Sequence, residues 1–233
     1  MNRILKTIGL LALTLLTAVP AYAATVIGKV NFTGTAPAME DINMEADPFC
    51  AGMHPEPLKN EDVLLNADNT LQNVFVYVKE GLPADKKFET PATPVTMDQK
   101  GCHYVPHVFG VQVGQAVEIV NSDSTLHNVH GMPTQSKEFN LGMPIPGMKL
   151  KRTFDKSEVM VKFKCDVHPW MHAYIGVLQH PFYSVTQESG SFEIKDLPPG
   201  DYVIEAWHEK FGTQTQKITV TDAPATADFT FTG

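Results

Sequence analysis

Short segments of alternating hydrophobic and polar residues recur along the chain, and this pattern predicts β-strands. Residues 158–165 alternate, with Val159, Val161, Phe163 and Cys165 on one face. A half-buried strand directs such a face toward the apolar interior. We therefore expect the thiol of Cys165 to point inward at the end of this strand.

The alternation ends directly after Cys165. Asp166 and Pro169 interrupt it, so we expect a tight loop that brings His168 and Met171 back over the sulfur. With His172, this stretch holds a thiol, two imidazoles and a thioether, which are ligand types that copper selects. The next strand is predicted over residues 175–178.

The remaining pattern predicts an all-β chain. Short strand signals separated by Pro and Gly fill residues 90–120, as in a β-sandwich. Residues 39–57 are irregular, and residues 131–148 have no steady period. Further strands are predicted at 25–32, 74–78, 116–120, 202–207, 217–221 and 227–231.

A second part of the ligand set is expected upstream. His127 follows the strand predicted over 116–120 and a polar turn that begins at Asn121. Together with the Cys-x-x-His-x-x-Met stretch, this arrangement resembles the cupredoxins. The resemblance implies a Greek-key β-sandwich with a copper cofactor. It implies His127, Cys165 and His168 as equatorial copper ligands and Met171 as a weak axial ligand.

The spacing departs from that of plastocyanin, whose axial Met would fall at Ala173. The His-x-x-Met spacing is similar to that of the CuA domains of cytochrome oxidase, but no second loop Cys is present, which argues against a binuclear centre. His172 could replace Met171 as axial ligand. His107 and His130 are candidates for auxiliary ligands.

The last part of the chain carries a different motif. Residues 186–192 and the Leu-Pro-Pro-Gly-x-Tyr turn that ends at Tyr202 resemble the carboxypeptidase regulatory-like, or transthyretin-like, β-sandwich. This stretch is too short for a whole module, so the strands near 25–32 and 74–78 are candidates for its missing strands. His208, at a strand end, could reach the cupredoxin part, but a capping or interface role is favoured.

These observations divide the chain into four segments. Residues 1–23 form a secretory signal with a basic start, an apolar run and a small-x-small cleavage site. An N-terminal β segment covers 24–93, a cupredoxin domain 94–180 and a second β-sandwich segment 181–233. The arrangement as a whole resembles exported plastocyanin-like proteins grouped as methylamine utilisation proteins. The signal predicts export to the periplasm, and no membrane span is expected in the mature chain.

Cysteine number and charge narrow the hypotheses. An exported chain with three cysteines suggests a Cys50–Cys102 disulfide and a metal-protected Cys165; a disulfide that includes Cys165 is the alternative. The formal charge is −8, and cleavage of the signal removes two basic residues, which makes the mature chain still more acidic. This acidic balance argues against nucleic acid as a partner.

The favoured function is a mononuclear copper electron carrier with a redox partner protein. The alternative is a copper chaperone or storage protein that binds Cu(I) through Met, His and Cys. A zinc site remains open because Cys and His also suit zinc. An enzyme with Cys165 and His168 as nucleophile and base is disfavoured, since the sequence shows no orienting carboxylate. The sequence predicts neither the oligomeric state nor the identity of the partner.

Overall fold

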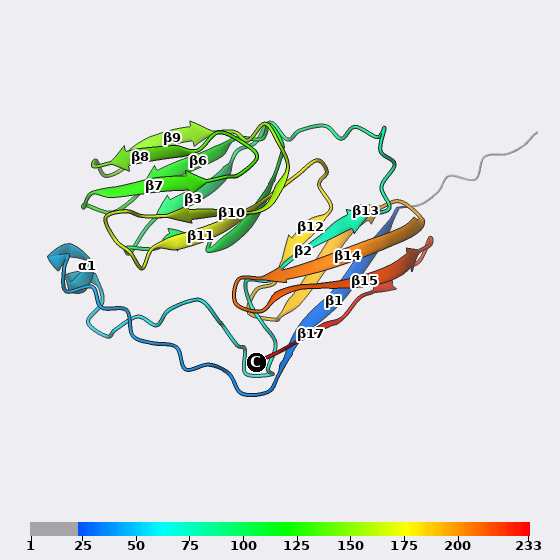
Figure 1. Cartoon of the computed structure of the whole chain (residues 1–233), viewed down its shortest axis with the longest axis horizontal. Coiled ribbons are helices and arrows are strands. Elements are labelled where there is room, and N and C mark those ends of the chain that lie inside the picture. The colour runs from blue at the N-terminus through cyan, green and yellow to red at the C-terminus, as the bar shows by residue number, and fades with distance from the viewer. Residues whose placement is uncertain (1–22) are drawn as a thin grey trace, which may run out of the picture.

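The computed structural model describes residues 23–233, a nearly all-β chain folded as two β-sandwiches (Figure 1). The all-β prediction is confirmed. The predicted export signal lies, except for Ala23, outside these residues. Within the described part of the chain, no helix is both long enough and apolar enough to cross a bilayer.

The first sandwich is built from two sheets. Its five-stranded sheet has the order β5-β11-β10-β7-β8 and its four-stranded sheet the order β4-β3-β6-β9. Most neighbours are antiparallel, but β11 pairs with β5, and β3 with β6, in parallel. The strands are β3 (Val95–Gln99), β4 (Tyr104–Val105), β5 (Val108–Gln112), β6 (Val117–Asn121), β7 (His127–Met132), β8 (Phe139–Met143), β9 (Lys149–Arg152), β10 (Glu158–Lys164) and β11 (His172–Leu178).

The second sandwich combines strands from both ends of the chain. β1 pairs with β13, β16 and β17, and the other sheet has the order β12-β2-β14-β15. Because β1 and β2 precede the first sandwich in sequence, that sandwich is inserted between two parts of the second. The strands are β1 (Ala24–Thr33), β2 (Phe75–Glu80), β12 (Tyr183–Val185), β13 (Ser191–Leu197), β14 (Gly200–His208), β15 (Gly212–Val220), β16 (Ala225–Thr226) and β17 (Phe229–Thr232).

The two sandwiches meet through Phe75 of β2, which is fully buried. Its ring packs over Gly110 and Gly176 of the first sandwich, where an added Cβ would lie 2.8 and 2.3 Å from ring atoms. Tyr183 donates a hydrogen bond from its hydroxyl to the Gly110 carbonyl, at 2.7 Å. Two glycines therefore permit a close aromatic contact between the domains.

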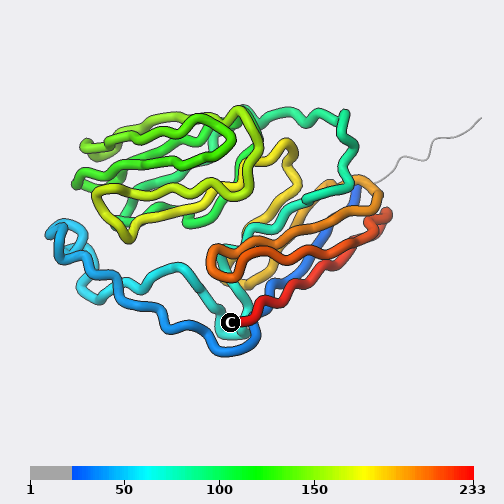
Figure 2. The backbone as a smooth tube through the Cα atoms, in the orientation of Figure 1, coloured from blue at the N-terminus to red at the C-terminus, as the bar shows by residue number. Residues whose placement is uncertain are grey.

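Residues 34–73 leave the second sandwich and run along the first one before they return (Figure 2). This excursion carries the helix α1 (Pro48–Met53), which follows the N-cap Asp47. The predicted disulfide between Cys50 and Cys102 is confirmed and ties α1 to the first sandwich. This part of the predicted 24–93 segment thus packs on the inserted sandwich, where Met44 and Cys50 join its core.

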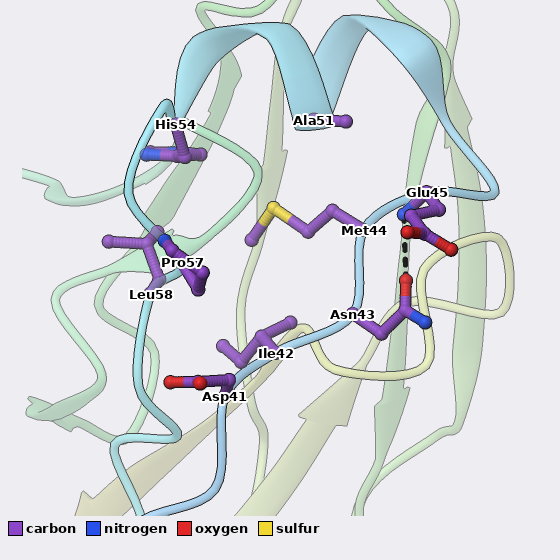
Figure 3. A pocket seen from close by; sticks show the side chains of 9 residues that line it. All are labelled: Asp41, Ile42, Asn43, Met44, Glu45, Ala51, His54, Pro57 and Leu58. Atoms are coloured by element: carbon purple, nitrogen blue, oxygen red, sulfur yellow. Dashed lines mark hydrogen bonds between the residues drawn. The ribbon is translucent and has the colours of Figure 1, made fainter.

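A hollow of about 270 Å³ lies between the part of the excursion before α1 and the part after it. Figure 3 shows Met44 reaching into the hollow from the first part, with His54 and Leu58 on the second. His54 also contacts the Gly101 carbonyl through Nε2 at 2.8 Å. The excursion is therefore held against the first sandwich on both sides of α1.

Candidate metal centre

Three strand ends position the expected equatorial ligands. His127 is the first residue of β7, Cys165 directly follows β10, and His168 lies in the turn before β11. The Cys165 amide donates to the Met171 carbonyl at 3.0 Å, and the Met171 amide to the His168 carbonyl at 2.9 Å. The loop after Cys165 therefore turns back on itself.

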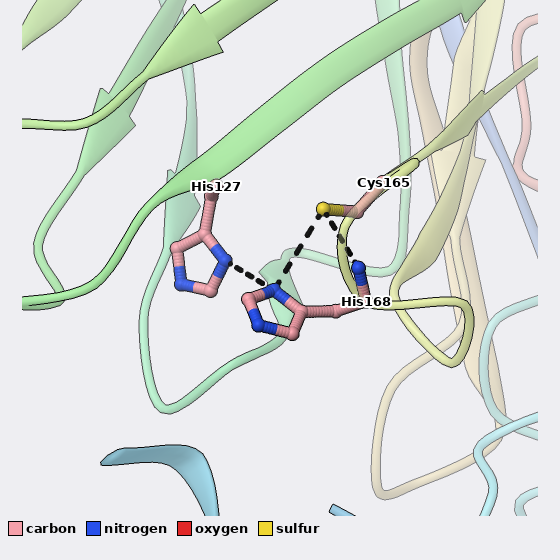
Figure 4. Close-up of side chains that lie close together, drawn as sticks. All are labelled: His127, Cys165 and His168. Atoms are coloured by element: carbon pink, nitrogen blue, oxygen red, sulfur yellow. Dashed lines mark hydrogen bonds between the residues drawn. The ribbon is translucent and has the colours of Figure 1, made fainter. Parts of the chain in front are cut away.

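The structure brings His127, Cys165 and His168 together, as Figure 4 shows. The two Nδ1 atoms are 2.9 Å apart, and the Cys165 sulfur lies 3.8 Å from Nδ1 of His168. One ligand atom from each residue falls within 4.8 Å of the others. A metal ion sits roughly 2.0–2.3 Å from such nitrogen and sulfur donors, so this spacing can accommodate one ion. All three residues are at most 2% exposed.

Asn128 braces the loop that carries the thiol. Its side-chain oxygen accepts from the amides of Asp166 at 2.7 Å and Val167 at 3.3 Å, and it lies 3.3 Å from the Cys165 sulfur. In that contact the thiol is the donor, whereas the sulfur accepts from the His168 amide at 3.4 Å. The amide donor stabilises the thiolate form, which is the form that binds metals.

Each imidazole has a carboxylate partner on its outer nitrogen. Nε2 of His127 lies 2.9 Å from Asp123, and Nε2 of His168 lies 2.9 Å from Asp47. A carboxylate that accepts from Nε2–H leaves Nδ1 free for a metal and fixes the ring orientation. The residues present therefore fit a metal ion held by two Nδ1 atoms and one sulfur.

These contacts shift the protonation of the site. Burial lowers the pKa of His127, but its hydrogen bonds with Asp123 and Cys165 outweigh burial and raise the pKa to about 9. Burial raises the pKa of Cys165, but hydrogen bonding to His127 and backbone amides lowers it overall. Burial lowers the pKa of His168 more than its bond to Asp47 raises it. These contacts thus shift Cys165 toward its thiolate form and His127 toward its imidazolium form.

Met171 lies in the same buried core cluster as Cys165 and is 1% exposed. Its side chain also lines a small hollow with Tyr104 and His107. The Tyr104 hydroxyl donates to the Asn128 carbonyl at 2.5 Å. The role of Met171 as axial ligand stays a prediction.

The other candidate histidines lie in different surroundings. His130 contacts Glu138 at 2.6 Å and Asp166 at 3.0 Å. His107 and His172 instead form a group with Glu209, a residue of the second sandwich, and are not part of the triad's group of ligand atoms. The residue that crosses to the first sandwich is therefore Glu209 rather than its neighbour His208.

Sequence reasoning missed three carboxylates that hold these histidines. Asp47 precedes Pro48, and an Asp-Pro pair is a signal for a helix start that would have pointed to α1. Asp123 lies in the polar turn before His127, four residues away. Glu209 gives no signal, because it comes from the other sandwich. Asp47 also supplies the orienting carboxylate that the enzyme hypothesis lacked. That the chain is not an enzyme stays a prediction.

Comparison with known proteins matches the chain in two places. The model of the carboxypeptidase regulatory-like domain matches residues 169–232, so the predicted resemblance of this segment is confirmed. The match begins in the turn before β11 and does not include β1 and β2. No curated protein matches the chain.

Among solved structures, the chain is similar to cupredoxins. A copper-containing nitrite reductase (NirK) from Thermus scotoductus SA-01 is 26% identical, with a TM-score of 0.34, over 42% of this chain and 25% of its own. A purple cupredoxin from Nitrosopumilus maritimus is 22% identical, with a TM-score of 0.31, over 36% of this chain and 98% of its own. A mutant of amicyanin in the Cu(I) state is 22% identical, with a TM-score of 0.33, over 42% and 99%. The chain thus spans about a quarter of the nitrite reductase.

Proposed function

We propose that this chain is an exported, mononuclear copper protein that carries single electrons. The observation that supports it most directly is the convergence of one ring nitrogen each of His127 and His168 and the Cys165 sulfur within 4.8 Å in a buried site. Two imidazoles and one thiolate are the equatorial ligand set of electron-transfer copper sites. Copper bound there would alternate between Cu(I) and Cu(II).

The surrounding residues hold this ligand set in place. Asp123 and Asp47 fix the rings of His127 and His168, and Asn128 fixes the loop that carries the thiolate. Rings and loop that cannot reorient suit a site in which both oxidation states share one geometry, since reorganisation slows electron transfer. Met171 would tune the potential as a weak axial ligand.

Electrons would leave the site through Trp170. Both ligand imidazoles are buried, and the outer nitrogen of His168 faces Asp47 and lies 3.9 Å from the Cys50 sulfur. The ring of Trp170 lies 5.0 Å from that of His168 and lines a cleft of about 640 Å³. A redox partner protein would therefore dock over this cleft rather than over a bare ligand histidine.

The periplasm is the proposed location. The predicted signal at residues 1–23 argues for export, and the Cys50–Cys102 disulfide suits an oxidising compartment. A buried Cys165 that binds metal is also protected from forming a wrong disulfide there.

A redox titration tests this function. The protein is loaded with one equivalent of Cu(II), reduced with ascorbate and reoxidised with ferricyanide, while the thiolate-to-copper absorption band is followed. We expect the band to disappear and return with one electron per chain over repeated cycles.

A copper chaperone would behave differently in the same experiment. It would bind more than one Cu(I) per chain, show no intense band, and give its copper to a Cu(I) chelator without a redox cycle. That result would replace the electron-carrier proposal with the chaperone alternative.

A further inference from the structure

A second histidine cluster lies where the two sandwiches meet. His107 precedes β5 and His172 begins β11, both in the first sandwich, whereas Glu209 follows β14 in the second. One carboxylate oxygen of Glu209 lies 2.5 Å from Nε2 of His107, and the other lies 3.2 Å from Nε2 of His172. Asp62, from the excursion, lies 3.3 Å from the same His172 nitrogen.

We propose that His107, His172 and Glu209, assisted by Asp62, form a second site for a divalent transition-metal ion. Ligand atoms of the first three fall within 4.8 Å of one another. Two imidazoles with carboxylate oxygens and no thiolate suit zinc, Cu(II) or iron(II). The inference concerns residues outside the His127–Cys165–His168 site and does not depend on it.

The far side of His172 supports a metal at its Nε2. Nδ1 of His172 lies 3.2 Å from the Trp170 carbonyl, which places a proton on Nδ1 and leaves the Nε2 lone pair free for a metal. Nε2 of His172 nevertheless faces carboxylate oxygens of Glu209 and Asp62, so a cation fits between them, either a second proton on the ring or a metal ion. For His107, Glu61 lies 3.8 Å from Nδ1, beyond hydrogen-bond distance, so Nε2 can donate a proton to Glu209 or bind a metal in place of that proton.

Local charge favours a divalent ion in that place. With neutral imidazoles, the cluster contains three carboxylates, of Asp62, Glu209 and Glu61, and one ammonium, of Lys210, which lies 2.6 Å from Asp62. The side chains of His107 and Glu209 are only 5% and 7% exposed. Buried charges of one sign are costly unless they are paired or bind a metal, and one divalent ion would neutralise this cluster.

The site is accessible from solvent. His172, Glu209 and Asp62 line the cleft of about 640 Å³ that also exposes Trp170. A metal ion can enter through this cleft, and an open coordination position on that side could take water or a small anionic ligand. The ion would also join the two sandwiches, because Glu209 comes from one and both histidines from the other.

Zinc binding to a variant without the first site tests the proposal. In the background Cys165→Ser/His127→Phe, titration with Zn²⁺ followed by calorimetry should show one site per chain. His107→Phe or Glu209→Gln, added to this background, should weaken binding at least ~10–100-fold, the range found even for outer-shell partners of metal sites. His130→Phe is the matched control, because His130 also lies between two carboxylates but has no second imidazole beside it.

Zinc should also raise the unfolding temperature of the background protein but not of the Glu209→Gln variant, and circular dichroism would establish that each variant is folded. Absence of zinc binding by the folded background protein would overturn the proposal, and the cluster would then be an interdomain ion pair only. Binding that is unchanged by both His107→Phe and Glu209→Gln would overturn it as well. Failure of the copper proposal would leave these results unaffected, because the background lacks that site.

Discussion

The two histidine clusters of this chain each join two imidazoles to carboxylates, but they differ in sulfur and in access. The His127–Cys165–His168 site contains a thiolate and lies beneath α1, with no ligand more than 2% exposed. The His107–His172–Glu209 cluster has only nitrogen and oxygen atoms and opens to a cleft. A soft thiolate in a buried site suits a copper ion that transfers electrons. Nitrogen and oxygen atoms beside a cleft suit a harder metal ion with an open coordination position.

The helix α1 covers the first site and is tied to the first sandwich by the Cys50–Cys102 disulfide. Removal of this disulfide is expected to have the largest effect. Cys50→Ala/Cys102→Ala opens a loop with a sequence separation of 52 residues. We expect a loss of about 2–5 kcal/mol in the free energy of unfolding, measured by denaturant titration. The triad would still bind copper, but α1 would no longer cover His168. A loss below about 1 kcal/mol would show that α1 is held mainly by its other contacts.

Asn128→Ala should have the next largest effect. It removes the acceptor for the part-buried amides of Asp166 and Val167. The expected cost is about 0.5–1.5 kcal/mol for each lost hydrogen bond, with a shift of the thiolate-to-copper band because the loop that carries Cys165 loses its brace.

Asn140→Ala provides the matched control for that change. Asn140 contacts both Asn128 and Asp166 through its side chain, but it is exposed. Its loss should cost less and leave the band in place. Equal effects of the two substitutions would contradict the role assigned to Asn128.

A smaller effect is expected at the His107–His172–Glu209 cluster. Lys210 is half exposed and offsets the charge of Asp62. Lys210→Ala should therefore strengthen zinc binding by up to about fivefold, in line with roughly 0.2–1 kcal/mol for an exposed ion pair. The measurement is the same zinc titration, and weaker binding would argue that Lys210 orients Asp62 rather than opposing the metal.

The smallest effect is predicted for a histidine outside both clusters. Burial lowers the pKa of His180, against an opposing backbone hydrogen bond to Val78. The folded state therefore binds this proton less readily than the unfolded state, so stability falls as pH drops through the unfolded value of about 6.5.

Replacement of His180 by Phe tests that sign. Between about pH 7.5 and pH 5.5, the wild-type protein should lose more stability than His180→Phe, by less than about 1.4 kcal/mol per pH unit. Because the change in the free energy of unfolding between the two pH values is compared within each protein, any pH-independent effect of the substitution on stability cancels. A larger loss in the variant would contradict the lowered pKa.

Local pattern was sufficient to predict most of the fold. The alternation that ends at Cys165 predicted β10 and the tight loop after it, and cysteine number favoured the disulfide that the structure contains. Strand β8 was missed because Gly and Pro interrupt the pattern around it. The start of β15 was missed because its first residues, from Gly212, are polar on both faces of an edge strand.

The surroundings of the site were harder to predict because they depend on distant parts of the chain. Asp47 reaches His168 across 121 residues, and Glu209 reaches His107 across 102. Such contacts are set by the packing of α1 and by the interface between the sandwiches, and no local period encodes them. His107 and His172 could be identified as candidate ligands, but their joint carboxylate could not.

The visible absorption spectrum of the copper-loaded protein, compared with that of Cys165→Ser, shows whether the Cys165 thiolate binds copper. We predict an intense thiolate-to-Cu(II) band in the wild-type protein and its complete loss in the variant, while His107→Phe keeps it. A wild-type protein that binds one Cu(II) without such a band, or a band that survives Cys165→Ser, would contradict copper ligation by Cys165.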